Sequence, residues 1–321
     1  MIRFFWACAM LALAVVPFAS HAQAWPARPV KIIVPYPPGG AVDMVTRKMA
    51  ARLQEQTGQS FIVDNRPGAT STIGIMATVH APADGYTLVA NDTTYALLPH
   101  IFRKLPFDPR QDLVPVGAFV FAPMAVAVRT ASPYRTLGDL VGAARQSPGK
   151  VTYGTGGAGS SPHFASEALG MATQVRFQHI PFKGAGEATQ AVLAGTIDYQ
   201  IASTPGVIAQ VRGGTMRLLA VSGDLRLPAL PEVPTFAEAG VKGYGVVNFT
   251  GLWAPRGTPA EVTNRLQAEI ARAMASGDMQ AYAEGIGAEP GYWDAAAFAR
   301  NLEERTAYWG KVATNAEFEK Q

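Results

Sequence analysis

Cysteine is almost absent from this sequence of 321 residues, since Cys8 is the only one. It lies in the N-terminal segment MIRFFWACAMLALAVVPFASHAQA, which has a positive charge at Arg3, a short apolar run and the small-residue motif Ala22-Gln23-Ala24. This pattern is typical of a secretory signal peptide, so we predict cleavage after Ala24 and a mature chain that begins at Trp25. A membrane anchor is the alternative, but the apolar run is short for a membrane-spanning helix.

Once the signal peptide is removed, the predicted mature chain contains no thiol. That excludes a disulfide framework and a cysteine metal site. The histidines do not supply a metal site either, because none of them shows the spacing that zinc ligands have in sequence. They are His21, His80, His100, His163 and His179. We therefore expect neither a metal nor a cofactor.

Charged residues are also scarce, at 16% of the sequence against 48% hydrophobic residues. This composition allows a sizeable core and excludes a disordered chain. The formal net charge is +3, and it falls to +2 when Arg3 leaves with the signal peptide. Lysines and arginines form no run or stripe, so we expect no nucleic-acid partner. The length predicts two domains.

The segment VTYGTGGAGSSPH, residues 151–163, raises two enzymatic alternatives. Its glycines match the G-x-G-x-x-G pattern of dinucleotide-binding proteins, but the following strand ends in QHIPFK and supplies no acid for a ribose. A dehydrogenase is therefore disfavoured. Ser160 and Ser161 precede His163 closely, so an exported serine hydrolase stays open as an alternative function. It lacks the G-x-S-x-G elbow, and a histidine so near in sequence must fold back to reach the serine.

Predicted strands and helices alternate along the chain in two successive units. The first unit has strands at 30–34, 61–64 and 86–90 and helices at 43–56 and 72–79. The second has strands at 125–128, 151–153, 177–180, 197–202 and 218–221 and helices at 137–146, 163–169 and 187–194. A strand at 252–254 is expected to rejoin the first unit, followed by helices at 259–274 and 295–309. This order predicts two α/β lobes joined by paired crossings, with a cleft between them.

Each unit contains a glycine-rich turn between a strand and a helix. The turns are Pro37-Pro38-Gly39-Gly40-Ala41 and Thr155-Gly156-Gly157-Ala158-Gly159-Ser160-Ser161. Ligands of open α/β sheets bind at the carboxyl ends of strands, and the first turn of a helix offers unpaired amides to an anion. Two such turns across a cleft can hold one carboxylate, with hydroxyl donors from Thr155, Ser160 and Ser161. We expect Ser161 to be the N-cap of the second helix, with Pro162 at its first position.

Nine segments together resemble the solute-binding proteins of tripartite tricarboxylate transporters, also called the Bug family. The resemblance covers essentially the whole mature chain in the right order. The segments are PYPPGGAVDMVTRKMA (35–50), DNRPGATSTIG (64–74), APADGYTL (81–88), LPFDPRQDLVPV (105–116), YGTGGAGSSPHFASE (153–167), HIPFKGAGEA (179–188), LAGTIDYQI (193–201), LPEVPTFAEAG (230–240) and GLWAPRGTP (251–259).

The resemblance implies a two-lobed periplasmic binding protein, type II-like, whose lobes are mostly parallel sheets flanked by helices. The first lobe is expected to comprise residues 25–124 and 246–321, and the second residues 125–245. A small organic carboxylate is held between the two turns by amides, hydroxyls and bridging waters. The positions that match the family site are Pro38, Gly39, Gly40, Ala41, Thr155, Gly159, Ser160, Ser161 and His163.

Residues 70 and 71 depart from the family pattern, which typically has two glycines there. Thr70 and Ser71 border the expected cleft, so we include them in the site as residues that reshape its far end. The resemblance further implies a periplasmic monomer, without enzymatic activity, that delivers its ligand to membrane permease subunits or to a sensor protein. A ligand-free interaction module is a second alternative beside the serine hydrolase. The identity of the carboxylate stays open.

Overall fold

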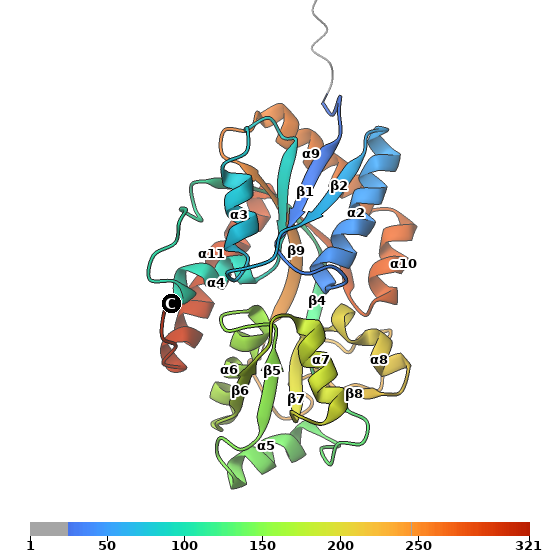
Figure 1. Cartoon of the computed structure of the whole chain (residues 1–321). Helices are drawn as coiled ribbons and strands as arrows, with labels where there is room; N and C mark the ends of the chain where they lie inside the picture. Colours follow the sequence, from blue (N-terminus) through green and yellow to red (C-terminus); the bar gives the residue numbers. More distant parts are fainter. Residues whose placement is uncertain (1–24, 245) are drawn as a thin grey trace, which may run out of the picture.

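The computed structural model describes residues 25–244 and 246–321. The predicted signal peptide, residues 1–24, and with it the cleavage after Ala24, lies outside them. The described chain folds into two α/β lobes, one above the other in Figure 1.

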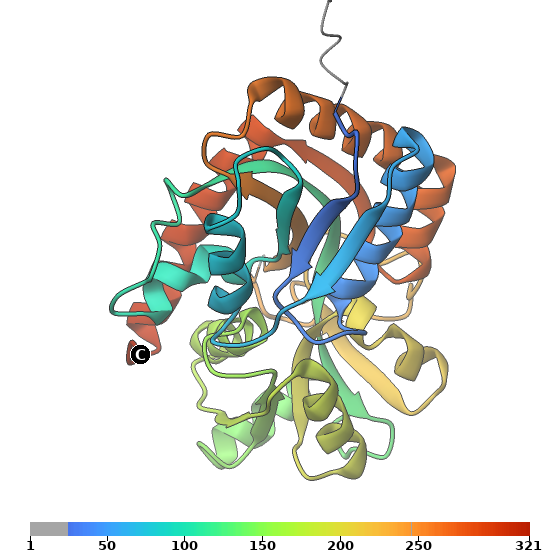
Figure 2. The same cartoon turned by 45° about the horizontal axis from the view of Figure 1, so that its top comes forward.

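The first lobe contains both ends of the described chain. Its strands are β1 (Val30–Val34), β2 (Phe61–Asn65), β3 (Thr87–Asn91), β9 (Val247–Pro255), β10 (Glu289–Asp294) and the first half of β4 (Leu113–Arg129). Its helices are α2 (Ala41–Thr57), α3 (Thr72–Val79), α4 (Thr94–Ile101), α9 (Ala260–Met274), α10 (Gly277–Gly285) and α11 (Ala295–Asn315). β1 pairs in parallel with β2 and β3, whereas β9 and β10 pair antiparallel with their neighbours. Helices cover both faces of this sheet (Figure 2).

The second lobe is smaller and repeats the same plan. Its strands are β5 (Thr152–Thr155), β6 (Gln178–Pro181), β7 (Tyr199–Ser203), β8 (Met216–Val221) and the second half of β4. Its helices are α5 (Leu137–Gln146), α6 (Ser161–Thr173), α7 (Ala185–Ala194) and α8 (Ile208–Arg212), with a short 3-10 turn η1 (Thr204–Gly206) before α8. β5 pairs in parallel with β6 and β7, while β4 runs antiparallel to β7 and β8.

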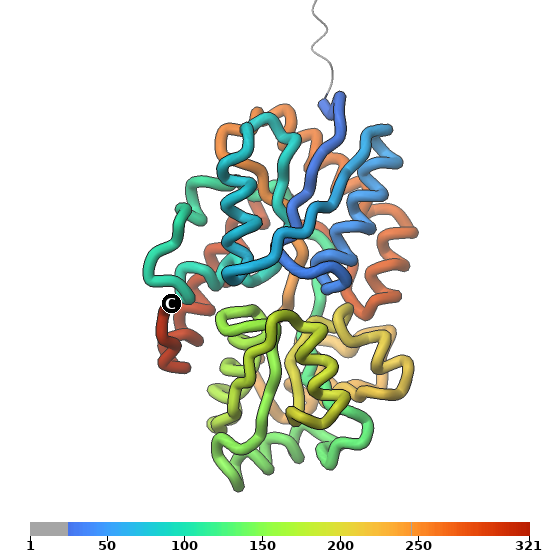
Figure 3. The backbone as a smooth tube through the Cα atoms, in the orientation of Figure 1, coloured from blue at the N-terminus to red at the C-terminus, as the bar shows by residue number. Residues whose placement is uncertain are grey.

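The chain crosses between the lobes along β4 and again on its way into β9 (Figure 3). β4 pairs with β9 as far as Pro123 and with β7 from Met124 onwards, so one strand belongs to both sheets. Just before this change, Val120 has φ +53 at an irregularity of the β4–β9 register. Such a bulge bends a strand and lets it leave one sheet for another. The predicted two-lobed α/β fold is confirmed.

The lobes share part of their apolar core. One continuous cluster of buried residues includes Ile101 and Trp309 from the first lobe and Phe164 from the second. α11 makes this connection, because it packs against α4 in its own lobe and against α6 in the other. The glycine-rich turns therefore lie on two bodies that are already in contact.

Candidate ligand-binding site between the lobes

Five helices begin directly after parallel strands and receive no hydrogen bond from an N-cap side chain. They are α2, α3 and α4 in the first lobe and α6 and α7 in the second. By contrast, the N-cap side chains of α5, α10 and α11 do bond their helices, through Thr136, Ser276 and Asp294. First-turn amides have no partner within a helix, and they carry a partial positive charge. The helices α2, α3, α6 and α7 thus have uncapped first turns, whereas a first-turn amide of α4, α5, α10 and α11 already donates to a side chain.

These helix starts meet across the lobes. A Cβ atom placed on Gly184, the N-cap of α7, would lie 3.6 Å from Cγ of Pro37 in the first turn. A Cβ atom on Gly159 would lie 2.8 Å from Cγ2 of Ile101, which belongs to the first lobe. Each of the two predicted turns therefore lies against the other lobe, although the turns are more than a hundred residues apart in sequence.

In the first turn, Asp43 holds the backbone in place. Its Oδ2 accepts the amide of Gly39 at 2.9 Å, and its Oδ1 accepts the Asn65 side chain at 2.8 Å. Arg47 Nε donates to the same carboxylate at 3.0 Å. Burial works to raise the pKa of Asp43, but the hydrogen bonds from Arg47, Gly39 and Asn65 outweigh it and lower the pKa. Asp43 thus fixes the conformation of the first turn. The Gly39 amide already donates to Asp43 and is therefore not a donor for a ligand.

The second turn is held by its own side chains. The Ser160 hydroxyl donates to the Gly157 carbonyl at 2.8 Å, and the Thr155 hydroxyl lies 2.7 Å from Nε2 of His179. The helix α6 begins at Ser161 with Ser160 as its N-cap, so our prediction of Ser161 as the cap was wrong by one residue. The reason is that the Ser160 backbone has the extended conformation of a cap, with φ −68° and ψ 159°.

His163 also holds the second turn in place. Its Nδ1 accepts the amide of Gly159 at 3.1 Å, which places the ring proton on Nε2. The ring stacks on His179 with centroids 3.9 Å apart. Burial, with a smaller effect of the His179 charge, lowers the pKa of His163 to about 3, and burial lowers that of His179 to about 4. Both rings are therefore neutral at physiological pH, and His163 positions Gly159.

This geometry does not assemble a catalytic serine. The hydroxyl of Ser160 points to a carbonyl, and the hydroxyl of Ser161 lies 3.4 Å from Oδ2 of Asp92. Among the described residues, neither serine has a hydrogen bond to a histidine, as a nucleophile activated by a base requires. The serine hydrolase alternative gains no support from the site.

Asp92, which the sequence reasoning missed, lies between the turns. It is only 7% exposed. Its Oδ1 accepts the Tyr36 hydroxyl at 2.7 Å and the Thr94 amide at 2.8 Å. Its Oδ2 accepts the Asn248 side chain at 3.0 Å and faces Ser161. The signal that could have found it is the run Asn-Asp-Thr-Thr directly after a buried strand, where ligands of α/β sheets bind.

The loop before α3 carries unusual backbone angles. Ala69, Thr70 and Ser71 have φ of +44, +48 and +72, which non-glycine residues rarely adopt. Glycine adopts positive φ without strain, and glycines are what the family resemblance leads us to expect at positions 70 and 71. Ser71 is 2% exposed, and its Oγ has no hydrogen-bond partner in the described chain. This buried hydroxyl adjoins the start of an uncapped helix.

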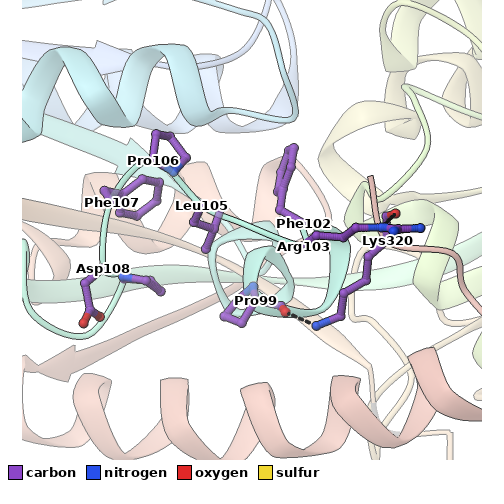
Figure 4. A pocket seen from close by; sticks show the side chains of 9 residues that line it. Pro99, Phe102, Arg103, Leu105, Pro106, Phe107, Asp108 and Lys320 are labelled. Atoms are coloured by element: carbon purple, nitrogen blue, oxygen red, sulfur yellow. Dashed lines mark hydrogen bonds between the residues drawn. The ribbon is translucent and has the colours of Figure 1, made fainter.

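A surface hollow of about 490 Å³ lies elsewhere, between the segment after α4 and the C-terminal residues. Figure 4 shows Lys320 reaching the Pro99 carbonyl at its rim, at 2.8 Å. None of the predicted site residues lines this hollow. Within residues 25–244 and 246–321, no group of histidine, cysteine and acidic side chains is arranged to hold a metal ion. In the same ranges, no helix has both the length and the apolar character needed to cross a bilayer.

Comparison with known proteins identifies the family. The model of the tripartite tricarboxylate transporter family receptor, TctC, matches residues 45–317. The chain belongs to this family. A curated relative of this receptor is a UPF0065 protein from the tcbD-tcbE intergenic region of Pseudomonas sp. strain P51. It is 37% identical over 273 residues, which cover 84% of this chain and 81% of the relative.

Two solved relatives of the receptor contain carboxylates. A protein from R. palustris, solved with adipate, is 34% identical with a TM-score of 0.88, and the match covers 92% of this chain and 100% of that one. MatC from Rhodopseudomonas palustris, with bound malate, is 28% identical with a TM-score of 0.83, covering 90% and 100%. The predicted family is therefore confirmed. The receptor is a solute-binding protein of a periplasmic family and not an enzyme.

Proposed function

We propose that this receptor captures a small organic carboxylate between the N-termini of α2 and α6. The observation that supports the proposal is that both helices lack a side-chain cap and begin at glycine-rich turns, each of which lies against the other lobe. The donors are the amides of Gly40 and Ala41 in the first lobe and of Ser161 and His163 in the second. Pro162 has no amide proton and occupies a position where none is needed.

The other predicted residues support these donors. Asp43 holds the Gly39 amide, and His163 holds the Gly159 amide. Thr155 and Ser160 brace the second turn, while Pro38 and Gly39 form its exposed counterpart in the first lobe. Thr70 and Ser71 shape the end of the site beside α3. Each charge-assisted amide–carboxylate bond contributes about 1.5–3 kcal/mol, so a few of them reach roughly micromolar affinity after ordering costs.

Closure of the lobes completes the site in this proposal. Only the closed form presents both sets of amides, so the ligand favours it by differential affinity. The moving bodies are residues 25–124 with 246–321, and residues 125–245. The closed, periplasmic monomer then delivers its ligand to membrane permease subunits or to a sensor. The carboxylates in the solved relatives and the family's transporter-receptor name support this role.

A thermal-shift screen tests the proposal. Protein that begins at Trp25 is heated with a library of mono-, di- and tricarboxylates, aromatic acids and amino acids. A true ligand at about 100 times its dissociation constant stabilises the fold by about 2.7 kcal/mol, which raises the melting temperature by several degrees. The ligand should be recovered unchanged. Amides or methyl esters of the same acids are the control, and they should give no shift. Failure of every carboxylate would contradict the proposal and favour a ligand-free interaction module.

A further inference from the structure

Asp92 touches the residues that flank both glycine turns. Tyr36, which donates to its Oδ1, immediately precedes the first turn. Ser161, which lies 3.4 Å from its Oδ2, is the last residue of the second turn and the first of α6. Any ligand whose carboxylate sits between the turns therefore has Asp92 close by. This inference rests on the function proposed above and concerns the class of carboxylate.

The charge of Asp92 has no cationic partner. Among residues 25–244 and 246–321, no lysine, arginine or histidine forms an ion pair with it. Its four hydrogen-bond partners are neutral groups that can each donate, and the single Tyr36 proton is shared between Oδ1 of Asp92 and Oδ1 of Asn91, each at 2.7 Å. Buried charges in proteins are normally paired, because removing them from water is costly. A negative charge that is 7% exposed at a ligand site therefore calls for a positive group from the ligand.

The positions of the hydrogen-bond donors around Asp92 indicate where a positive group of the ligand fits. The Oδ1 of Asn248 accepts the amides of Thr93 and Phe249, so its Nδ2 must face Asp92. Ser161 has one hydroxyl proton, and it points to Asp92, which leaves only lone pairs on that oxygen. This contact is the longest of the four and the only one of them from the second lobe. A ligand ammonium can take the place of this contact and donate to both Oδ2 of Asp92 and Oγ of Ser161. A second ligand carboxylate at the same place would meet two acceptors.

Helix capping explains only part of this arrangement. Oδ1 of Asp92 accepts the Thr94 amide and so caps the first turn of α4. A cap needs one oxygen, and serine or asparagine serves equally well. Oδ2 faces Asn248 and Ser161 instead, away from the capped amide. Capping of α4 therefore does not explain why the residue is charged, nor why its Oδ2 faces the contact between the lobes.

We infer that the ligand is a carboxylate that also carries a protonated amine. Its carboxylate binds the amides of α2 and α6, and its ammonium replaces the Ser161 hydroxyl against Oδ2 of Asp92. The same charge disfavours dicarboxylates such as those found in the two solved relatives, adipate and malate. Asp92 is thus a specificity-determining residue.

Calorimetry with ligands of equal chain length tests this inference. The four-carbon set is butyrate, 2-aminobutyrate, 4-aminobutyrate and succinate, and the corresponding five-carbon set extends it. For wild-type protein, an amino compound should bind about 10-fold or more tightly than its plain acid, and the dicarboxylate most weakly. In Asp92→Asn, which keeps the size and one capping oxygen, the advantage of the amine should fall below about 3-fold while the plain acid is retained.

The control is Asp139→Asn, which removes a capping acid from α5 and should leave the ligand ranking unchanged. If Asp92→Asn does not fold, the wild-type ranking alone decides. The inference is overturned if a dicarboxylate binds wild-type protein as tightly as its amino counterpart, or if Asp92→Asn weakens all ligands alike. In both cases carboxylate binding, and with it the proposed function, survives. Absence of binding by any acid contradicts the proposed function and removes the basis of the inference.

Discussion

At the scale of residues, side chains near the glycine turns hold the backbone of the turns in place. Asp43 accepts the amide of Gly39, and His163 accepts that of Gly159. Asp43 lies in the first turn of α2, where an acid is favoured, and no local sequence pattern shows that it also fixes the preceding turn. Its partner Asn65 comes from β2, and no local pattern indicates that contact.

Acid is expected to destabilise the protein through His163 and His179. Both have an ordinary pKa of 6.5, which the fold lowers to about 3 and about 4. As the pH falls below 6.5, these histidines become protonated in the unfolded chain but stay neutral in the folded chain. The folded state therefore becomes less stable relative to the unfolded state. The free energy of unfolding should fall between pH 6.5 and 4 by up to about 1.4 kcal/mol per pH unit for each histidine. Urea denaturation at several pH values measures this slope.

His163→Gln separates the contribution of one ring. Glutamine does not titrate, and its carbonyl can still accept the Gly159 amide, so the pH slope should shrink by about the share of one histidine. His80→Gln alters an exposed residue and serves as the matched variant. If the pH dependence of the free energy of unfolding is unchanged in His163→Gln, then protonation of His163 does not cause the acid destabilisation.

At the scale of elements, an added N-cap side chain on α2 is expected to affect protein stability and ligand binding in opposite directions. Gly40, the N-cap of α2, has φ −73° and ψ 166°, which aspartate adopts readily at that position. Gly40→Asp should stabilise the ligand-free protein by a few tenths of a kcal/mol. It should also weaken carboxylate binding by about 100-fold, because the new side chain takes the helix donors and repels the ligand. Thermal melting and calorimetry measure the two effects.

Thr136→Asp is the matched control for that variant. It places the same acid at the N-cap of α5, which is already capped and is outside the proposed site. Carboxylate binding should remain as in wild-type protein. Normal binding by Gly40→Asp would mean that α2 does not hold the ligand.

Most elements were predictable because their apolar patterns are local. The helix at 72–79 and the strand at 30–34 match α3 and β1 to the residue. β4 was predicted only at 125–128, although it spans 17 residues. Pro115, Gly117 and Pro123 read as breakers in its first half, yet the register shifts of this strand accommodate such residues. The helix α4 was missed because Pro99 interrupts its pattern.

At the scale of the whole molecule, ligand-driven closure can be measured by cross-linking. Pro37 and Gly184 face each other across the lobes, and the predicted mature chain has no cysteine of its own. In the double variant Pro37→Cys, Gly184→Cys, a carboxylate ligand should speed disulfide formation by about 10-fold, because it populates the closed form. Non-reducing electrophoresis follows the reaction, and each single variant controls for links between molecules. Equal rates with and without ligand would contradict closure on binding.

The sequence by itself determined the α/β alternation, the two glycine-rich turns and the family, because these depend on residue types and spacing along the chain. Only the tertiary structure decided which donors remain available at those turns and that Asp92 lies between them. The physical reason is that a hydrogen bond requires its two groups to be neighbours in space. The partners of Asp92 come from β9, from α4 and from both turns, and those segments meet only when the two lobes are folded together.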